Sequence, residues 1–461
     1  MERTLMPDAA ATEVAATDTA ATDAAAPATD AEPSLPELPL HRECPYRPPS
    51  GYDALREEGP MTRVRLYDGR PVWAVSGYSA VRTLLAHPAL SVDRRSGDYP
   101  LPVKPMSQLR EAGAVTLEAL LRTDPPDHAR QRRAVMGPFT AGRTAELEPR
   151  VEQVVAERLA ALAGPAATGE QVDLLEEFAR PVVSTVLADV LGLPEAERDR
   201  FQRATFRHFS PVRAVAGFLD EQIGALLPAA DSPSAPEQAP KQAPKQAAPD
   251  QAPEAASAAA PPAGLLARLA EKVAEGVLDR AEAVNCGMAL VLAGQDLTAN
   301  TLVIAVLTLL DHPEQLDILL REPELWPGAV DELLRFMPLT GGTPRVAAKD
   351  VSIEGLGTLR AGDGLILLNP AANHDPAQYE SPGALDVRRP AHGHLAFGHG
   401  IHLCVGQHLA RLEMVVALRA LFSRYPAMRL AVPAEEIRAK QGVVIGLVAL
   451  PVLLEAGPTE A

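Results

Sequence analysis

The sequence predicts a mainly α-helical fold with a small β part. Long stretches at residues 143–163, 172–193 and 281–310, and after residue 406, either repeat apolar residues at helical intervals or are nearly continuously apolar. Short strand patterns with turn residues between them lie mainly at residues 62–75 and 351–368. Length alone suggests about three domains, because a domain averages ~150 residues.

The composition narrows the class of function. The 461-residue chain has a formal net charge of −17, which argues against a nucleic-acid-binding protein, because such a protein carries a basic stripe. Its cysteines, Cys44, Cys286 and Cys404, are few and odd in number. This count argues against a disulfide scaffold and favours a reducing compartment, so we expect a cytoplasmic protein.

Three segments are predicted to be disordered. Residues 1–36 are rich in Ala, Thr, Asp and Pro and show neither a signal peptide nor a membrane anchor. Residues 228–263 are rich in Pro, Ala and Gln and lack apolar periodicity, so we expect an extended surface insertion. Residues 456–461 are expected to form a short tail.

The first folded elements are expected between residues 51 and 86. Residues 51–58 and 78–86 have helical patterns. Residues 62–67 and 72–75 resemble two strands, with Asp68-Gly69 as the hairpin turn between them. Further along, Gly192-Leu193-Pro194 predicts the end of the apolar helix that precedes it.

The longest apolar run, residues 281–310, has the length of a membrane span. It contains Asn285, Gln295, Asp296 and Asn300. A central Asp costs ~2.5–3.5 kcal/mol on insertion into a membrane. We therefore predict a helix buried in the core, in which Asp296 has a functional role.

One cysteine lies in a glycine-rich loop that leads into an apolar-periodic segment. The stretch is Phe397-Gly398-His399-Gly400-Ile401-His402-Leu403-Cys404-Val405-Gly406. A thiolate at a helix N-terminus is stabilised by the helix dipole and by N–H groups, and it can serve as an axial ligand of haem iron. The chemistry alone leaves two alternatives: a buried apolar cysteine, or a zinc site with the histidines at 394, 399, 402 and 408.

These ten residues resemble the signature FGxGxHxCxG of the cytochrome P450 family at each fixed position, and the resemblance extends over roughly residues 45–455. It implies one large, mostly helical domain with a small β part, here residues 37–455 with the insertion inside it. It also implies haem b, with Cys404 as the iron ligand. Phe397, Gly398 and Gly406 would border the cofactor.

Further motifs suggest where the haem carboxylates bind. Asp124-Pro125-Pro126-Asp127 favours a helix start, and His128 and Arg132 lie four residues apart on one helix face. The pair resembles the family motif HxxxR, whose members bind haem propionates. By the same resemblance, Arg345 and His402 are expected to be propionate donors. Nearby Arg130 and Arg133 should face elsewhere, as surface charge or as part of a patch for a redox protein.

Glu332 and Arg335 are neighbours on a helix by their spacing. This spacing also occurs at 177–180, 197–200 and 435–438, so by itself it is weakly specific. Only Glu332 and Arg335 lie between the long apolar helix and the cysteine loop, as the family motif ExxR does. The resemblance implies a buried pair that shapes the haem-side core, so we count both among the cofactor-binding residues.

The middle of the long helix resembles the family motif AGx[DE]TT. Gly294 and Asp296 match, whereas Leu297 occupies the position of the usual alcohol. Thr298 matches the second Thr but lies about 100° further round the helix, so we expect it to point away. Without the alcohol, we expect protons to reach the oxygen site through a substrate hydroxyl or amine, or through water held by Asp296 and Gln295. The remaining alternative is a reaction other than simple hydroxylation, such as C–C or C–O coupling or desaturation.

The resemblance implies a monomeric haem-thiolate monooxygenase that acts on a small natural product. Electrons would come from NAD(P)H through a separate ferredoxin and ferredoxin reductase, since three cysteines cannot supply both a haem thiolate and a four-cysteine cluster. The resemblance is to bacterial members of the family, many of which modify secondary metabolites. Leu297 keeps two alternatives open: a non-catalytic haem-binding module that binds a partner or carrier protein, and a peroxide-driven haem enzyme.

Overall fold

The computed structural model describes residues 35–38, 40, 42, 44–95, 99–101, 119–205, 212–227, 264–440 and 445–455. Residues 36–461 form one compact unit, in agreement with the single domain expected from the family resemblance rather than the three suggested by length. The segments predicted to be disordered lie outside the described residues, apart from residues 35 and 36. Their disorder therefore stays a prediction.

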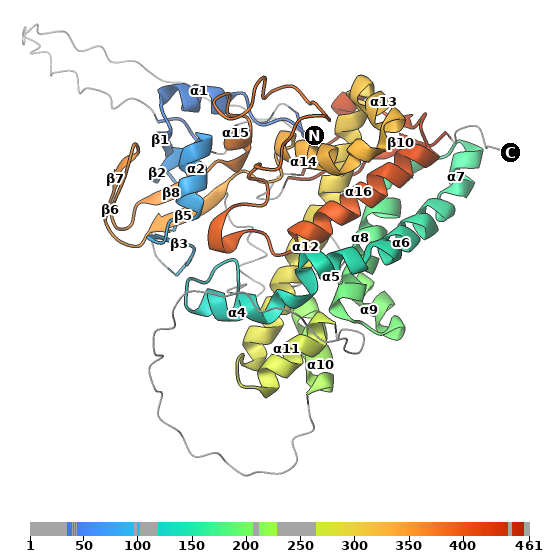
Figure 1. The fold of residues 1–461 in the computed structure, drawn as a ribbon, viewed down its shortest axis with the longest axis horizontal. Helices are drawn as coiled ribbons and strands as arrows, with labels where there is room; N and C mark the ends of the chain where they lie inside the picture. Colours follow the sequence, from blue (N-terminus) through green and yellow to red (C-terminus); the bar gives the residue numbers. More distant parts are fainter. Residues whose placement is uncertain are drawn as a thin grey trace, which may run out of the picture. The chain divides into compact units, whose positions relative to one another are not determined.

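Helices dominate this unit (Figure 1). Their bounds are α1 (Gly51–Glu58), α2 (Tyr78–Leu85), α4 (Asp127–Val135), α5 (Ala141–Glu146), α6 (Glu148–Ala161), α7 (Ala163–Thr168), α8 (Arg180–Leu191), α9 (Glu195–Thr205), α10 (Val212–Leu226), α11 (Leu265–Ala274), α12 (Arg280–Leu310), α13 (Pro313–Arg321), α14 (Trp326–Phe336), α15 (Asn369–Asn373) and α16 (Gln407–Arg424). The mainly α prediction is confirmed.

The strands form three small sheets. Their bounds are β1 (Met61–Arg65), β2 (Pro71–Val75), β3 (Leu90–Ser91), β4 (Gln171–Asp173), β5 (Thr343–Ala347), β6 (Val351–Ile353), β7 (Gly357–Leu359), β8 (Gly364–Leu367), β9 (Arg429–Leu430) and β10 (Pro451–Leu453). The largest sheet has the order β1-β2-β8-β5-β3, in which only the β2–β8 pair is parallel. The predicted turn between β1 and β2 is confirmed, with Gly69 at φ 84°.

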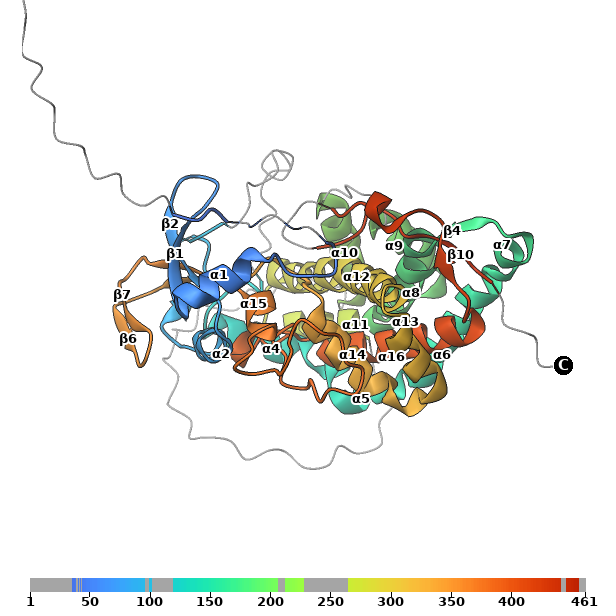
Figure 2. The same ribbon diagram turned by 90° about the horizontal axis from the view of Figure 1, so that it is seen from above.

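Helix α12 lies at the centre of the helical part, where it contacts α8, α10, α11 and α16 (Figure 2). It begins with a capping box, in which Asp279 and Glu282 satisfy each other's backbone N–H groups. Among the described residues it is the one helix long and apolar enough to span a membrane. Because α12 packs on several sides and is mostly buried, we describe it as a core helix.

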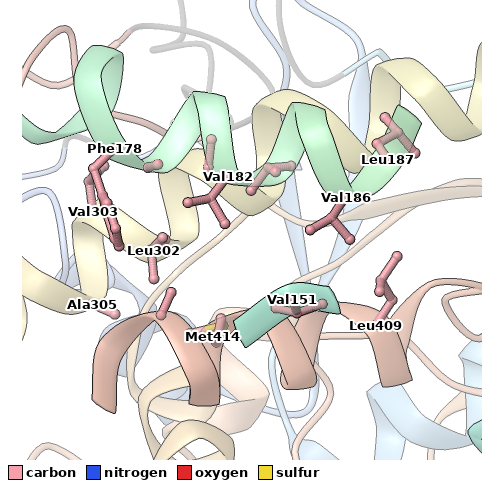
Figure 3. Packing of buried hydrophobic residues seen from close by; sticks show 14 of the residues in the cluster. Val151, Phe178, Val182, Val186, Leu187, Leu302, Val303, Ala305, Leu409 and Met414 are labelled. Atoms are coloured by element: carbon pink, nitrogen blue, oxygen red, sulfur yellow. The ribbon is translucent and has the colours of Figure 1, made fainter. Parts of the chain in front are cut away.

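The main hydrophobic core lies between α8, α12 and α16 (Figure 3). Val182 and Val186 project from α8, and Leu409 and Met414 of α16 also belong to this core. Helices α10 and α11 pack against α12 at Gly287. A Cβ added there would lie 3.4 Å from a methyl carbon of Leu219 on α10. This packing places α12 and α16, the two helices next to the candidate site, in the same core.

Two predicted helices are shorter than expected. Residues 143–163 are divided among α5, α6 and α7, and Pro149 lies in the first turn of α6, where it cannot continue a preceding helix. Residues 172–193 begin as strand β4 and a π-turn before α8 starts at Arg180. The predicted stop is confirmed, because Gly192 adopts the left-handed conformation at φ 76°.

Candidate functional site

The cysteine loop is shaped by two glycines with positive φ. Gly398 and Gly400 both have φ of 74°, a region that favours glycine. At Gly400 an added Cβ would lie 2.8 Å from the backbone of Ala86, just after α2, so no side chain fits there. The loop closes through a hydrogen bond from the Cys404 N–H to the Phe397 carbonyl at 2.9 Å. Cys404 is therefore held two residues before Gly406, the N-cap of α16.

The electrostatics of Cys404 differ in part from the prediction. Burial raises the pKa of its thiol, and the Gly406 N–H, Arg132 and Arg411 oppose this effect without overcoming it. The helix start thus favours the thiolate but does not produce it. A bound metal ion deprotonates a coordinating thiol outright, so the ion itself would supply the remaining stabilisation.

Predicted propionate donors from three distant segments come together beside the loop. The rings of His128 and His402 lie 4.1 Å apart, centroid to centroid. Burial and neighbouring positive groups lower the pKa of His128 to about 4 and that of His402 to about 3. Arg132 donates to the Leu403 carbonyl at 2.8 Å, which fixes the residue before Cys404. Buried Arg345 also acts on His402 by its charge.

This cluster fits a dianionic ligand. Burial lowers the pKa of Arg345, and in the described part of the chain neither Arg132 nor Arg345 forms an ion pair with a carboxylate. Asp124, whose charge acts on His128 and Arg345, instead accepts hydrogen bonds from the Ser91 hydroxyl and the Val92 N–H. Two carboxylates of a bound group would compensate the buried Arg345 and the half-buried Arg132. The residues present therefore fit haem, with Cys404 as iron ligand.

Glu332 and Arg335 are fully buried and paired through two hydrogen bonds of 2.6 and 2.8 Å. Arg335 also donates to backbone carbonyls of residues 373, 382 and 384. These contacts hold the segment that precedes the cysteine loop in sequence. Sequence reasoning missed Arg389, which donates to Glu332 at 3.1 Å. Arg389 lies 57 residues after Glu332, so no helical or strand spacing connects the two in the sequence.

His374 belongs to this supporting segment. Its Nε2 lies 2.9 Å from the Phe336 carbonyl at the end of α14. Burial lowers the pKa of His374 to about 4, so the ring is neutral and donates to that carbonyl. A neutral donor suits this place, because Arg335 already brings one buried positive charge.

The candidate oxygen side of α12 combines open space with an acid. An added Cβ at Gly294 would meet no heavy atom within 4 Å among the described residues. Asp296 is half exposed, and its Oδ1 contacts Arg180 at 3.4 Å and Lys440 at 3.5 Å. Asn300 donates to the same oxygen at 3.0 Å and accepts from the Leu447 N–H. Asp296 thus joins α8, α12 and the C-terminal segment.

The other predicted site residues of α12 are Gln295, Leu297 and Thr298. Gln295 is buried and donates one amide N–H to the Thr205 hydroxyl on α9 at 3.0 Å, and its expected role in holding relay water stays a prediction. Leu297 packs against the hydrophobic core, and its carbonyl accepts from the Thr301 hydroxyl at 2.7 Å. Thr298 is half-buried, and its predicted orientation stays a prediction.

The structure gives no support to a zinc site. Within the described ranges, no group of three or more His, Cys, Asp or Glu side chains could hold a metal ion. His394, one of the proposed zinc ligands, instead contacts Asp331 and the Ala396 N–H. The cysteine loop therefore offers a single thiol ligand.

Comparison with known proteins gives a consistent result. The family model described as Cytochrome P450 matches residues 47–445. Pentalenic acid synthase of Streptomyces avermitilis is 39% identical over 421 residues, which cover 90% of this chain and 96% of the relative. Cytochrome P450 MoxA of Nonomuraea recticatena has a TM-score of 0.77 at 34% identity, covering 92% of this chain and 99% of the other.

A second solved structure carries a ligand. A mycinamicin VIII methyl hydroxylase of Micromonospora griseorubida, bound to mycinamicin VIII, has a TM-score of 0.75 at 32% identity, with coverage of 91% of this chain and 100% of the other. The relatives are named as hydroxylases and monooxygenases. The chain therefore belongs to the cytochrome P450 family and is a monooxygenase of the haem-thiolate type.

Proposed function

We propose that this enzyme inserts one oxygen atom of O2 into a small natural product of bacterial secondary metabolism. Its relatives include enzymes named for pentalenic acid and for mycinamicin VIII, which supports a natural-product substrate. Haem b, when bound at Cys404, supplies the activation of O2. We further propose that the enzyme acts in the cytoplasm as a monomer.

The observation that carries the proposal is the position of Asp296 beside Leu297 on α12. A carboxylate that is half exposed exchanges protons with solvent, and Arg180, Lys440 and Asn300 hold its Oδ1 in place. We propose that Asp296 supplies protons to the oxygen side of the haem. Because Leu297 has no hydroxyl, a hydroxyl or amine of the substrate, or ordered water, completes the route.

The test compares Leu297→Thr and Asp296→Asn, with Leu292→Thr as a control for placing Thr in α12. Leu297→Thr should leave the product formed per NADH unchanged with the native substrate. Asp296→Asn should lower product formation by roughly 10²-fold, the lower end for loss of a general acid. A large gain in coupling for Leu297→Thr would refute the substrate-assisted route. Full turnover on added peroxide without redox partners would favour the peroxide-driven alternative.

We propose a ferredoxin and a ferredoxin reductase as the electron donors. Arg130 contributes little to a docking patch, because it pairs with Glu282 at 2.8 Å and with Asp127 at 2.9 Å. Arg133 on the same helix is exposed, and Ile401 of the cysteine loop is 51% exposed. An exposed cation and an apolar side chain suit a small acidic partner that approaches the thiolate side.

A further inference from the structure

A buried aspartate on α14 connects the segments around the cysteine loop. Asp331 lies directly before Glu332, and its side chain is 12% exposed. Its carboxylate accepts from Arg411 Nε on α16 at 2.7 Å and from His394 Nε2 at 3.3 Å. His392 Nδ1 lies 3.5 Å from the second oxygen. These contacts join α14, the segment before the loop and α16.

The partners of Asp331 also contact Phe397, the first residue of the loop. The guanidinium carbon of Arg411 lies 4.5 Å from the Phe397 ring centroid, within the range of a cation–π interaction. The ring of His394 lies 5.5 Å from the same ring, centroid to centroid. Since the Phe397 carbonyl accepts the Cys404 N–H, the position of Phe397 connects Asp331 to Cys404.

Asp331 and Arg411 form a charge-balanced pair near the thiol. Arg411 favours the Cys404 thiolate through its charge. Although burial opposes ionisation, hydrogen bonds from His394 and Arg411 hold the pKa of Asp331 well below its usual range. The Nδ1 of His394 accepts the Ala396 N–H at 3.1 Å, so its Nε2 carries the proton that Asp331 accepts.

We propose that Asp331 is a positioning residue that holds Arg411 against Phe397 and offsets its charge, and that this pair sets the reduction potential of the iron bound at Cys404. Reduction adds a negative charge to the iron centre, so a nearby unbalanced cation stabilises the reduced state and an unbalanced anion destabilises it. Groups around a metal ligand tune potentials in this way. The inference rests on the haem–thiolate ligation alone, not on the substrate or proton route.

We expect the two single variants to shift the reduction potential in opposite directions. Asp331→Asn leaves the Arg411 cation unbalanced and should raise the potential, with a roughly tenfold change in the ferric–ferrous equilibrium constant, about 59 mV for a one-electron couple. Arg411→Gln leaves Asp331 unbalanced and should lower the potential by a similar factor. The double variant should return close to the wild-type value. Asp331→Glu should keep the wild-type potential.

The experiment is potentiometric titration of each purified holoenzyme, together with the Soret position of the ferrous carbon monoxide complex. Asp350→Asn and Arg360→Gln change the same charges on the exposed β6–β7 hairpin and serve as controls. Equal signs for the two single variants, or shifts no larger than those of the controls, would overturn the proposal. If Asp331→Asn does not retain haem, Arg411→Gln decides alone: a lowered potential supports the proposal, and an unchanged or raised one refutes it.

Discussion

Glu332 shows how a buried charge persists in this core. Its Oε1 accepts from Arg335, from the Asp386 N–H and from Arg389, and its Oε2 accepts from Arg335. Each contact replaces a hydrogen bond that water would make to the carboxylate. The pair is stable only as long as both partners remain, because removal of one leaves an uncompensated charge in a low-dielectric interior.

We therefore predict that Glu332→Ala destabilises the protein by ~3–5 kcal/mol and fails to retain haem. Urea unfolding and the haem content of the purified protein measure both effects. Glu197→Ala is the matched control, because Glu197 and Arg200 have the same sequence spacing on α9 but are partly exposed and 3.5 Å apart. This control should cost at most ~1 kcal/mol, and equal losses in the two variants would contradict the account.

At the residue scale, the family resemblance named the candidate iron ligand and propionate donors, but not the residues that contact the segments around them. Cys404, His128 and Arg132 were found because each lies in a short local motif, whereas Arg345 was named only by its position in the family resemblance. Arg389 and Asp331 act through partners that lie more than 50 residues away in sequence, so no local pattern marks them. Such partners become neighbours only in the folded chain.

Helix α4 carries His128 and Arg132, and its Arg130 pairs with Glu282 at the start of α12. Arg130 donates to Glu282 at 2.8 Å and to the Val277 carbonyl at 2.9 Å. The hydrogen bond from Arg130 lowers the pKa of Glu282 to about 2. Glu282 also accepts the Asp279 N–H in the capping box, so one carboxylate joins the two helices.

Glu282→Gln should release haem about two- to fivefold faster than wild type, because a partly exposed ion pair contributes ~0.5–1 kcal/mol. Haem transfer to apomyoglobin measures this rate. Since folding lowers the pKa of Glu282, its stabilisation is present above pH 4.5 and is lost as the pH falls toward 2. The variant should lack that part of the acid sensitivity.

Glu221→Gln is the control for this change, because Glu221 pairs with Arg200 between α9 and α10 and leaves α4 untouched. Haem release from this control should match wild type. Equal acceleration in both variants would show that Glu282 has no specific role in holding α4.

At the element scale, periodicity identified most helices but not where they break. Apolar spacing ran through residues 143–163, yet Pro149 begins a new helix there. The first residues of the apolar stretch 172–193 belong to strand β4, which pairs with β10 near the far end of the chain. A strand partner so distant in sequence is not visible in local spacing.

At the scale of the whole molecule, the site is assembled from segments that are far apart in sequence. His128 and Arg132 come from α4, Arg345 from β5, and Cys404 from the loop before α16. Asp296 comes from the central helix α12. The family resemblance, and not composition or length, predicted that α4, β5 and the cysteine loop meet. The role of Asp296 in this site stays a proposal. We propose that the enzyme works as a monooxygenase although Leu297 lacks a hydroxyl.

The fate of NADH electrons tests this claim most directly. Purified protein with surrogate redox partners is given a ligand that converts the haem from low to high spin. NADH consumed is then compared with peroxide released and product formed. We expect most electrons to appear in product, because Asp296 and the substrate complete proton delivery. Nearly complete release as peroxide would contradict it.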